Sequence, residues 1–368
     1  MLNLSQNGSS VWVAASTEQL LTPTAIALGK FDGVHLGHQR VIQPILPSVR
    51  VENGQNNSEK ILKDLPNHLT ESSTLPTPQK SIYSTVVTFD PHPQEFFSGQ
   101  RRTLLTPLDE KVEQLRSLGV EQLVLLPFNQ ELSALSPEDF VEKVIVKQLQ
   151  CQQLSVGEDF CFGKKRMGTA RDLQTIAARY NIPVTIVPIQ TDTDHPPINT
   201  DCSHNPQIID DGRISTSSIR QSLEAGDITK ANRLLGRLYT LTGVVVTGQK
   251  LGRTIGFPTA NLQPQTDKFL PRHGVYAVRV FILNHSPDTP PIPRMGVMNI
   301  GNRPTVNGTN SSIEVHLFDW SGDLYGQKLV VELVRFLRPE QKFSNLEALK
   351  NQIQLDSTIA REILTSKY

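Results

Sequence analysis

The sequence predicts two domains, an α/β domain built on a parallel sheet and a β-barrel domain. In the first half, apolar strand-like runs alternate with helical patterns, which is typical of a parallel sheet covered by helices on both faces. From Tyr239 onward, short β-type alternation is interrupted by Gly and Pro, which is typical of an antiparallel barrel or sandwich. At 368 residues, the chain also exceeds the size at which one hydrophobic core usually stops growing.

The α/β domain should contain five strands, at residues 24–29, 82–89, 122–127, 153–157 and 183–188. Helices are expected at 107–118 and 137–149, because each segment begins with a proline suited to a first helical turn and continues with helical spacing. Ser136 is placed to cap the second of these helices.

The barrel domain should contain strands at residues 241–248, 274–283, 295–301, 312–320 and 328–337. Residues 345–364 show helical spacing and are expected to pack outside the barrel. A helix-like segment at 217–236 leads into the barrel, so the boundary is expected within 226–238. Residues 1–225 are therefore assigned to the first domain and residues 226–368 to the second.

Two polar stretches are expected to be loops. Residues 51–80 are rich in Asn, Ser, Pro and Thr and have little periodicity, which predicts an inserted surface loop without catalytic residues. Residues 191–207 form a second polar stretch of this kind.

The composition argues against several classes of protein. Lys plus Arg equal Asp plus Glu at 36 each, so no global charge attracts nucleic acid or an acidic membrane surface. The three cysteines, Cys151, Cys161 and Cys202, have neither disulfide-framework nor zinc-ligand spacing. The N-terminus lacks signal-peptide features, and no run of about 18 apolar residues occurs. We expect a soluble cytoplasmic protein that binds neither membranes nor nucleic acid.

The segment GKFDGVHLGH, residues 29–38, follows a predicted strand and opens a predicted helix. A helix N-terminus offers unpaired N–H groups to a nucleotide phosphate, and the glycines permit close approach. His35 and His38 share one face of the first turn. By itself the pair is also compatible with a metal site or with two surface histidines, although no third or fourth metal ligand is visible at a recognisable spacing.

With TFDPHP at 88–93, this segment resembles the FAD synthetase module of bacterial bifunctional riboflavin kinase/FAD synthetases, and its H-x-G-H is similar to the signature of nucleotidylyltransferases. The resemblance implies a Rossmann-type, doubly wound sheet. It also implies catalytic roles for His35 and His38, which meet the triphosphate of ATP. The implied nucleotide contacts are Gly29, Phe31 and Gly37, and the implied flavin contact is His92.

Two further segments resemble this family. In VGEDFCFGKKRMG, residues 156–168, Asp159 is a candidate for contact with the nucleotide, and Phe160 and Phe162 are either flavin-stacking or core aromatics. RISTSSIR, residues 213–220, closes over the ATP phosphates in the family. The residues matched by position are Arg213, Thr216, Ser217 and Arg220. The usual Ser-Ser-Thr order is Ser-Thr-Ser here, and the segment alone also fits an ordinary capped helix start.

The run GQKLGRTIGFPTAN, residues 248–261, is not a Walker A loop, because its glycine spacing is too short and Gly-Arg-Thr replaces Gly-Lys-Ser/Thr. It resembles the glycine-rich loop and PTAN motif of riboflavin kinases, which form a compact β-barrel. The resemblance implies that Thr259 and Asn261 hold magnesium and ATP, and that Gly252 and Arg253 contact the nucleotide. Hard magnesium prefers oxygen ligands, so one hydroxyl and one carbonyl suffice beside substrate phosphates.

In SIEVHLFDW, residues 312–320, Glu314 projects from the opposite strand face to its apolar neighbours. Such a glutamate is most often a solvated surface charge. The resemblance instead implies that it is the base toward the ribityl 5′-hydroxyl of riboflavin, and segments 299–305 and 274–277 are also similar to the family.

The resemblance implies two reactions with Mg²⁺ and ATP: phosphorylation of riboflavin to FMN, and adenylylation of FMN to FAD with release of pyrophosphate. Riboflavin, FMN and ATP are the expected partners, and the oligomeric state is left open. Two other classes are considered. One is a single-activity nucleotidylyltransferase whose barrel only binds ligand, and the other is a non-enzymatic flavin- or nucleic-acid-binding protein.

Overall fold

The computed structural model describes residues 11–47, 81–192, 212–248, 252, 255–283, 292–305 and 308–366. The chain forms two compact units: unit 1 comprises residues 1–102 and 111–190, and unit 2 comprises residues 103–110 and 191–368. The assignment of residues 1–225 and 226–368 to two domains stays a prediction. The expected insert at 51–80 and most of the loop at 191–207 lie outside the described residues.

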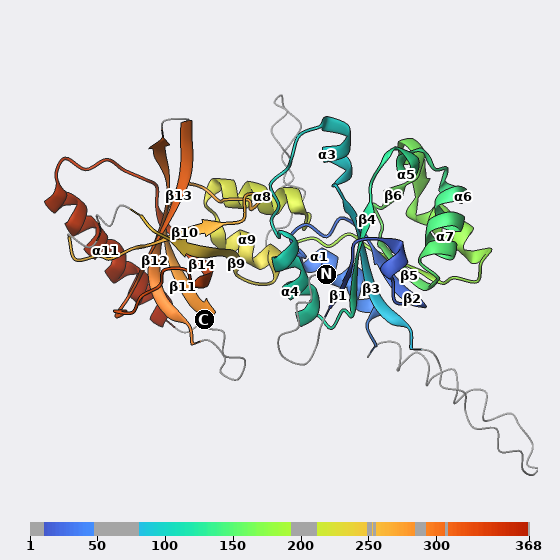
Figure 1. Cartoon of the computed structure of the whole chain (residues 1–368), viewed down its shortest axis with the longest axis horizontal. Coiled ribbons are helices and arrows are strands. Elements are labelled where there is room, and N and C mark those ends of the chain that lie inside the picture. Colours follow the sequence, from blue (N-terminus) through green and yellow to red (C-terminus); the bar gives the residue numbers. More distant parts are fainter. Residues whose placement is uncertain are drawn as a thin grey trace, which may run out of the picture. The chain divides into compact units, whose positions relative to one another are not determined.

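Unit 1 is built on a six-stranded parallel sheet with strand order β1-β4-β3-β2-β5-β8. Figure 1 labels β1, β2, β3, β4 and β5 of this sheet. Its strands are β1 (Trp12–Ala14), β2 (Thr24–Leu28), β3 (Tyr83–Asp90), β4 (Gln122–Pro127), β5 (Cys151–Gly157) and β8 (Val184–Val187). Every residue of β2 is buried, so helices and loops cover both sheet faces, as predicted. The five predicted strands are confirmed. β1 was not predicted, because three residues are too short to show a pattern.

The helical elements described between residues 11 and 190 are η1 (Thr17–Gln19), α1 (Leu36–Ile42), η2 (Gln43–Ile45), α3 (Pro93–Ser98), α4 (Leu108–Ser117), α5 (Gln130–Ala134), α6 (Pro137–Asp139), η3 (Phe140–Gln148), η4 (Lys164–Arg166) and α7 (Ala170–Ala178). The Ser136 hydroxyl accepts a hydrogen bond from the Asp139 N–H at 3.0 Å, which confirms the predicted cap. The predicted helix at 137–149 is present, but most of it is π-helical. A short hairpin, β6 (Cys161–Phe162) and β7 (Gly168–Thr169), precedes α7.

Unit 2 contains a closed antiparallel barrel with strand order β10-β13-β12-β11-β14-β9. Its strands are β9 (Tyr239–Val246), β10 (Ala260–Pro264), β11 (Gly274–Leu283), β12 (Arg294–Thr305), β13 (Gly308–Leu317) and β14 (Lys328–Arg338). Closure decides between the predicted barrel and sandwich. β10 was not predicted, because its residues were interpreted only as a motif.

Helix α11 (Leu346–Thr365) packs on the outer barrel surface, as predicted: Ala360 and Leu364 contact a cluster that includes Val275 and Val297. The predicted helical segment before the barrel is two helices, α8 (Thr216–Ala225) and α9 (Ile228–Leu235), separated at Gly226, whose φ is 82°.

Residues 103–110 are an unexpected part of unit 2. Leu105 is fully buried in the same hydrophobic cluster as the barrel interior. The Lys268 ammonium lies 2.5 Å from the Glu110 carboxylate and 2.7 Å from the Leu105 carbonyl oxygen, and the Lys268 side chain is 1% exposed. A buried ion pair therefore joins residues that are far apart in the sequence.

Candidate active sites

The turn between β2 and α1 has an uncommon backbone conformation. Phe31 and Val34 have φ values of 48° and 42°, in the left-handed region, and Gly33 has 95°. Non-glycine residues in this region are strained, and such strain collects at ligand-binding sites. The Phe31 ring is fully buried and lies under Gly29, where an added Cβ would be 3.1 Å from Phe31 Cε2. Gly29 therefore keeps the turn close to the sheet edge.

The two predicted catalytic histidines lie together at the start of α1. Their rings stack with centroids 3.6 Å apart and planes 20° apart. His35 Nδ1 accepts a hydrogen bond from the His38 N–H at 3.3 Å, so His35 caps the helix and is held in place by it. Gly37 lies between them in the first turn. Two imidazoles are thus fixed beside the strained turn.

Three cations that the sequence analysis did not single out lie around this turn. Burial lowers the pKa of Lys30, and the nearby charges of Arg166 and Arg102 lower it further. Burial, followed by Lys30 and Arg102, lowers the pKa of His92 to about 4, so His92 is neutral at pH 7. The Asp159 carboxylate opposes the shift at Lys30. Cationic groups that lower one another's pKa repel one another, so an anion bound among them is favoured.

The two aromatic residues of the GEDFCFG segment are packed into unit 1. Phe162 is 5% exposed, and its ring lies 5.4 Å from that of Phe140 and 5.8 Å from that of Phe160. Gly168 leaves the space that the Phe162 ring occupies, since an added Cβ would be 2.6 Å from it. These contacts favour the core interpretation.

An aromatic surface that sequence reasoning missed lies after β3 and β4. Phe96 and Phe97 of α3 contact Phe128 edge-on, with ring centroids 5.4 and 5.8 Å from it, and Phe89 lies 5.7 Å from Phe128. Phe97 is 72% exposed. The signal in the sequence was the pair Phe96-Phe97, which follows TFDPHP after Gln94 and Glu95.

The RISTSSIR residues belong to unit 2. Ser215 and Ser218 form a reciprocal capping box at the start of α8, with N–H to hydroxyl distances of 3.0 and 3.1 Å. Thr216 and Ser217 lie in the first turn of α8. Arg220 donates to the Thr103 carbonyl oxygen and lies 4.7 Å from the centre of the Phe269 ring. Arg220 thus has a structural role inside unit 2.

The barrel places three polar residues side by side on its outer face. Asn261 of β10 and Asn299 of β12 are both directly opposite Glu314 of β13. Paired residues on neighbouring antiparallel strands point to the same side, so the two amides flank the carboxylate. We call Asn261, Glu314 and Asn299 the polar row.

Two glycines lie beside the PTAN segment. An added Cβ at Gly248 would clash with the Asn261 amide, and one at Gly252 would clash with the Phe257 carbonyl oxygen. A side chain at Gly248 would therefore displace Asn261, and one at Gly252 would displace the backbone that leads into the PTAN motif. Arg253 lies outside the described residues.

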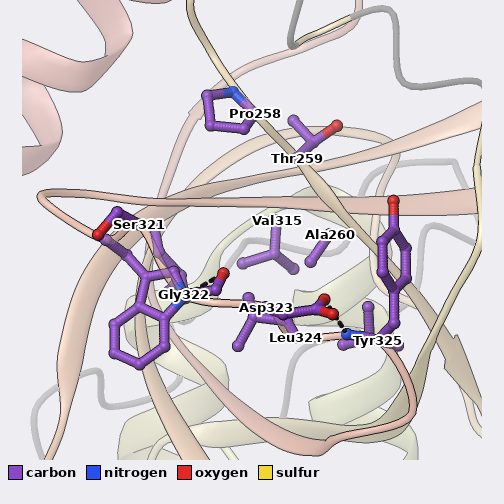
Figure 2. Close-up of a pocket in the computed structure, with 12 residues that line it drawn as sticks. Pro258, Thr259, Ala260, Val315, Ser321, Gly322, Asp323, Leu324 and Tyr325 are labelled. Carbon is purple, nitrogen blue, oxygen red and sulfur yellow. Dashed lines mark hydrogen bonds between the residues drawn. The ribbon is translucent and has the colours of Figure 1, made fainter.

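A pocket of about 550 Å³ opens beside Thr259 (Figure 2). Its floor is apolar and includes Ala260 and Val315, and Tyr325 forms a wall (Figure 2). Trp320 also lines the pocket with its aromatic ring. Thr259 contacts this pocket, whereas Asn261 and Glu314 do not line it.

The hydroxyl oxygen of Thr259 and the amide oxygen of Asn261 are hard donors of the kind that a divalent cation such as magnesium prefers. In the part of the chain that the structure describes, no cluster of three or more His, Cys, Asp or Glu side chains could hold a metal ion. Within the same ranges, none of the helices combines the length and apolar character needed to cross a membrane.

Known proteins resemble this chain over nearly its full length. The riboflavin kinase family model matches residues 235–364, and the FAD synthetase family model matches residues 17–56 and 67–200. Among curated relatives, the bifunctional riboflavin kinase/FMN adenylyltransferase of Escherichia coli (strain K12) is 35% identical over 338 residues, covering 92% of this chain and 91% of its own. That of Listeria monocytogenes is 34% identical over 340 residues, covering 91% of each chain.

Another relative carrying that description, from Pseudomonas fluorescens, is 36% identical over 337 residues, with 91% of each chain covered. A crystal structure from Streptococcus pneumoniae, described as a macrolide-efflux protein, has a TM-score of 0.73 and 26% sequence identity. The match covers 95% of this chain and 98% of that one. The likeness therefore extends across both units.

Proposed function

The chain belongs to the family of bifunctional riboflavin kinase/FMN adenylyltransferases, and on this premise we propose which of its residues perform the two reactions. Its C-terminal part phosphorylates riboflavin to FMN with ATP. Its N-terminal part transfers the adenylyl group of a second ATP to FMN, forming FAD and pyrophosphate. The observation that carries this function is the match of both family models, in this order, on one chain. We assign residues 1–225 and 226–368 to the two activities.

For the kinase, Glu314 is the general base. Its carboxylate accepts the proton of the ribityl 5′-hydroxyl as that oxygen attacks the γ-phosphorus of ATP and the bond to the leaving ADP breaks. The position of Glu314 between two amides supports this role, because amide N–H groups orient a carboxylate and neighbouring substrate oxygens.

Thr259 and Asn261 hold the divalent metal that ATP-dependent phosphoryl transfer generally needs, and we propose that it is Mg²⁺. When bound, Mg²⁺ neutralises charge on the phosphates. The Thr259 hydroxyl oxygen and the Asn261 amide oxygen supply the protein ligands. Gly252 lets the nucleotide phosphates approach Thr259, and Arg253 contributes positive charge to them.

For adenylyl transfer, an FMN phosphate oxygen attacks the α-phosphorus of ATP in line with the departing pyrophosphate, whose bond to that phosphorus breaks. His35 and His38 donate hydrogen bonds to the leaving group. The backbone at Gly29, Phe31 and Gly37 surrounds the phosphates. Lys30 and Arg166 add charge, and Asp159 contacts the nucleotide.

The flavin ring of FMN lies on the exposed aromatic surface of Phe96, Phe97 and Phe128, beside His92. An exposed aromatic surface beside cationic groups suits a flat apolar ring that carries a phosphate. Phe160 and Phe162 have a structural role in the core of unit 1. Arg220 acts structurally.

Riboflavin, FMN and ATP are therefore the partners that we propose, without nucleic acid or membrane. The balanced charge of the sequence supports this restriction. A cytoplasmic location is supported by the supply of ATP there and by the free thiols of Cys151 and Cys161.

The test is incubation of the full chain with riboflavin, ATP and MgCl₂, with chromatographic separation of the flavins. Successive appearance of FMN and FAD is expected. FAD formed only from added FMN would reduce the chain to a single-activity adenylyltransferase, and neither product would leave only a binding protein.

A further inference from the structure

Trp320, which follows β13, lines the pocket beside Thr259, and its ring is fixed from several sides. The indole N–H donates to the Gly322 carbonyl oxygen at 3.0 Å. An added Cβ at Gly322 would lie 2.6 Å from Trp320 Cζ2, so the backbone passes the ring at a distance that only glycine permits. The Arg294 guanidinium lies 5.3 Å from the centre of the same ring, within cation–π range.

The loop that carries Trp320 is anchored at both ends. At its start, Asp319 accepts two hydrogen bonds from Arg361 of α11, at 2.8 and 3.0 Å. At its end, the Gly326 N–H donates to the Val245 carbonyl oxygen at 2.9 Å, and the Gln327 carbonyl oxygen accepts from the Val245 N–H at 2.9 Å. A wall held in this way is formed before ligand binds, so little ordering cost falls on binding.

The chemistry of the pocket fits a nucleoside. Its apolar floor and aromatic walls suit a flat base, and its volume of about 550 Å³ is in the usual range for small-ligand sites. Asp323 offers a carboxylate for ribose hydroxyls, and its Oδ1 is fixed by the Tyr325 N–H at 3.0 Å. Thr259 lies on the rim, where the kinase mechanism places the phosphates of ATP.

We propose that Trp320 is the specificity-determining residue that selects a purine base in the kinase reaction, and that Arg294 and Gly322 are the positioning residues that hold its ring. This inference rests on the kinase function proposed above. A purine offers a larger stacking face than a pyrimidine, so stacking on the indole favours ATP over CTP. The same reasoning predicts that the isoalloxazine ring of riboflavin binds elsewhere, near the polar row.

The test measures FMN formation by the full chain while ATP, CTP and riboflavin are varied separately. Trp320→Ala should raise the KM for ATP on the order of tenfold, as expected for loss of one stacked base. It should also narrow the preference for ATP over CTP, with kcat and the KM for riboflavin changing less than about twofold. Trp320→Phe should keep the KM for ATP and the ATP/CTP preference close to those of the unaltered chain. Arg294→Met and Gly322→Ala should raise the ATP KM by a smaller factor.

The second tryptophan provides the matched control. Trp12→Phe lies in unit 1 and should leave all kinase constants unchanged, and it makes Trp320 the only tryptophan of the chain. In that background, titration with ADP and MgCl₂ without flavin should change tryptophan emission saturably. Adding Arg294→Met should alter the starting emission maximum, a readout of ring position that activity does not determine.

Absence of FMN formation by the unaltered chain would refute the kinase function itself. If the unaltered chain makes FMN but Trp320→Ala leaves the ATP KM unchanged, only the proposal for Trp320 fails. A rise in the riboflavin KM in place of the ATP KM would also overturn it, because the flavin would then occupy the pocket. If Trp320→Ala does not fold, the other two variants decide. The proposal is contradicted if Gly322→Ala leaves the ATP KM and the ATP/CTP preference unaltered and ADP causes no change in the tryptophan emission of Trp12→Phe.

Discussion

The two candidate sites are built in opposite ways. The phosphate turn of unit 1 comes from one continuous segment, residues 29–38, and its shape is set by left-handed backbone at Phe31 and Val34. The polar row of unit 2 comes from three strands, and strand register alone places Asn261 and Asn299 opposite Glu314. The first site depends on local conformation, whereas the second depends on closure of the whole barrel.

This difference has a consequence for sensitivity to change. A contiguous turn keeps its catalytic groups together as long as one strand and one helix hold. A row of side chains on several strands is lost when the barrel loosens. Substitutions of the active residues should therefore abolish one activity and leave the other. Substitutions that lower the stability of the barrel should reduce the kinase activity first.

The largest expected effect is on the kinase alone. Glu314→Gln keeps side-chain size but removes the base, so FMN formation from riboflavin should fall on the order of 10²–10⁴-fold. Conversion of supplied FMN to FAD should be unchanged, as measured by chromatography of timed reactions. Glu332→Gln, a half-buried glutamate on β14 of the same barrel, is the control and should retain kinase activity. A normal rate in Glu314→Gln would remove Glu314 from the mechanism.

The reciprocal lesion is in unit 1. His35→Ala/His38→Ala should lower FAD formation from FMN on the order of 10²–10³-fold, because hydrogen bonds to the leaving pyrophosphate are lost. Riboflavin should still be converted to FMN, which accumulates. Equal loss of both activities would show that the two sites are not independent.

Barrel stability can be lowered without touching either site. Lys268→Met leaves the Glu110 carboxylate buried without its partner, which should cost about 3–5 kcal/mol of the free energy of unfolding of unit 2. Kinase activity should then be lost at lower urea concentration than adenylyl transfer. Lys268→Met/Glu110→Leu should recover most of the loss. Simultaneous loss of both activities in Lys268→Met would contradict separate stability of the two units.

Metal binding should give a smaller effect. Thr259→Val and Asn261→Ala each remove one oxygen ligand, so the Mg²⁺ concentration for half-maximal kinase activity should rise on the order of tenfold. Thr242→Val, on neighbouring β9, is the matched loss of a hydroxyl and should have no effect. The rate of FAD formation from supplied FMN should be unchanged in both variants. Unchanged metal dependence in both variants would exclude these two ligands.

The smallest expected effect is a pH dependence in unit 1. The pKa of His92 is lowered to about 4, so the unfolded chain binds more protons than the native chain between this value and the ordinary His pKa. Its contribution to stability is complete above about pH 6.5 and is lost as the pH falls toward 4. Because His92 is partly exposed, the resulting loss in the free energy of unfolding is limited to about 1 kcal/mol. Urea unfolding between these pH values should show less pH dependence in His92→Gln, and equal slopes would contradict the shift.

The sequence was sufficient for much of this account where the information is local. Five strands of unit 1 and the cap at Ser136 follow from periodicity and turn chemistry, and the segment 29–38 follows from glycine spacing. The π-helical winding of η3 and the presence of residues 103–110 in unit 2 could not be predicted. Both depend on packing partners that are distant in the sequence.

For the sites, the same limit applies. The family-like motifs identified Asn261 and Glu314, but their pairing is a matter of barrel register, which one strand pattern does not specify. Lys30, Arg102 and Arg166 were not singled out, because isolated basic residues are common on surfaces. Only their shared surroundings distinguish them.

The central claim, that the two activities reside in independent sites, is tested most directly by mixing the two inactive variants. Glu314→Gln and His35→Ala/His38→Ala are each incubated with riboflavin, ATP and MgCl₂, alone and together, and FAD is measured by chromatography. Each alone should form little FAD. The mixture should form FAD, because FMN released by the histidine variant is a substrate for the glutamate variant. A mixture that accumulates FMN but forms no more FAD than either variant alone would contradict the account.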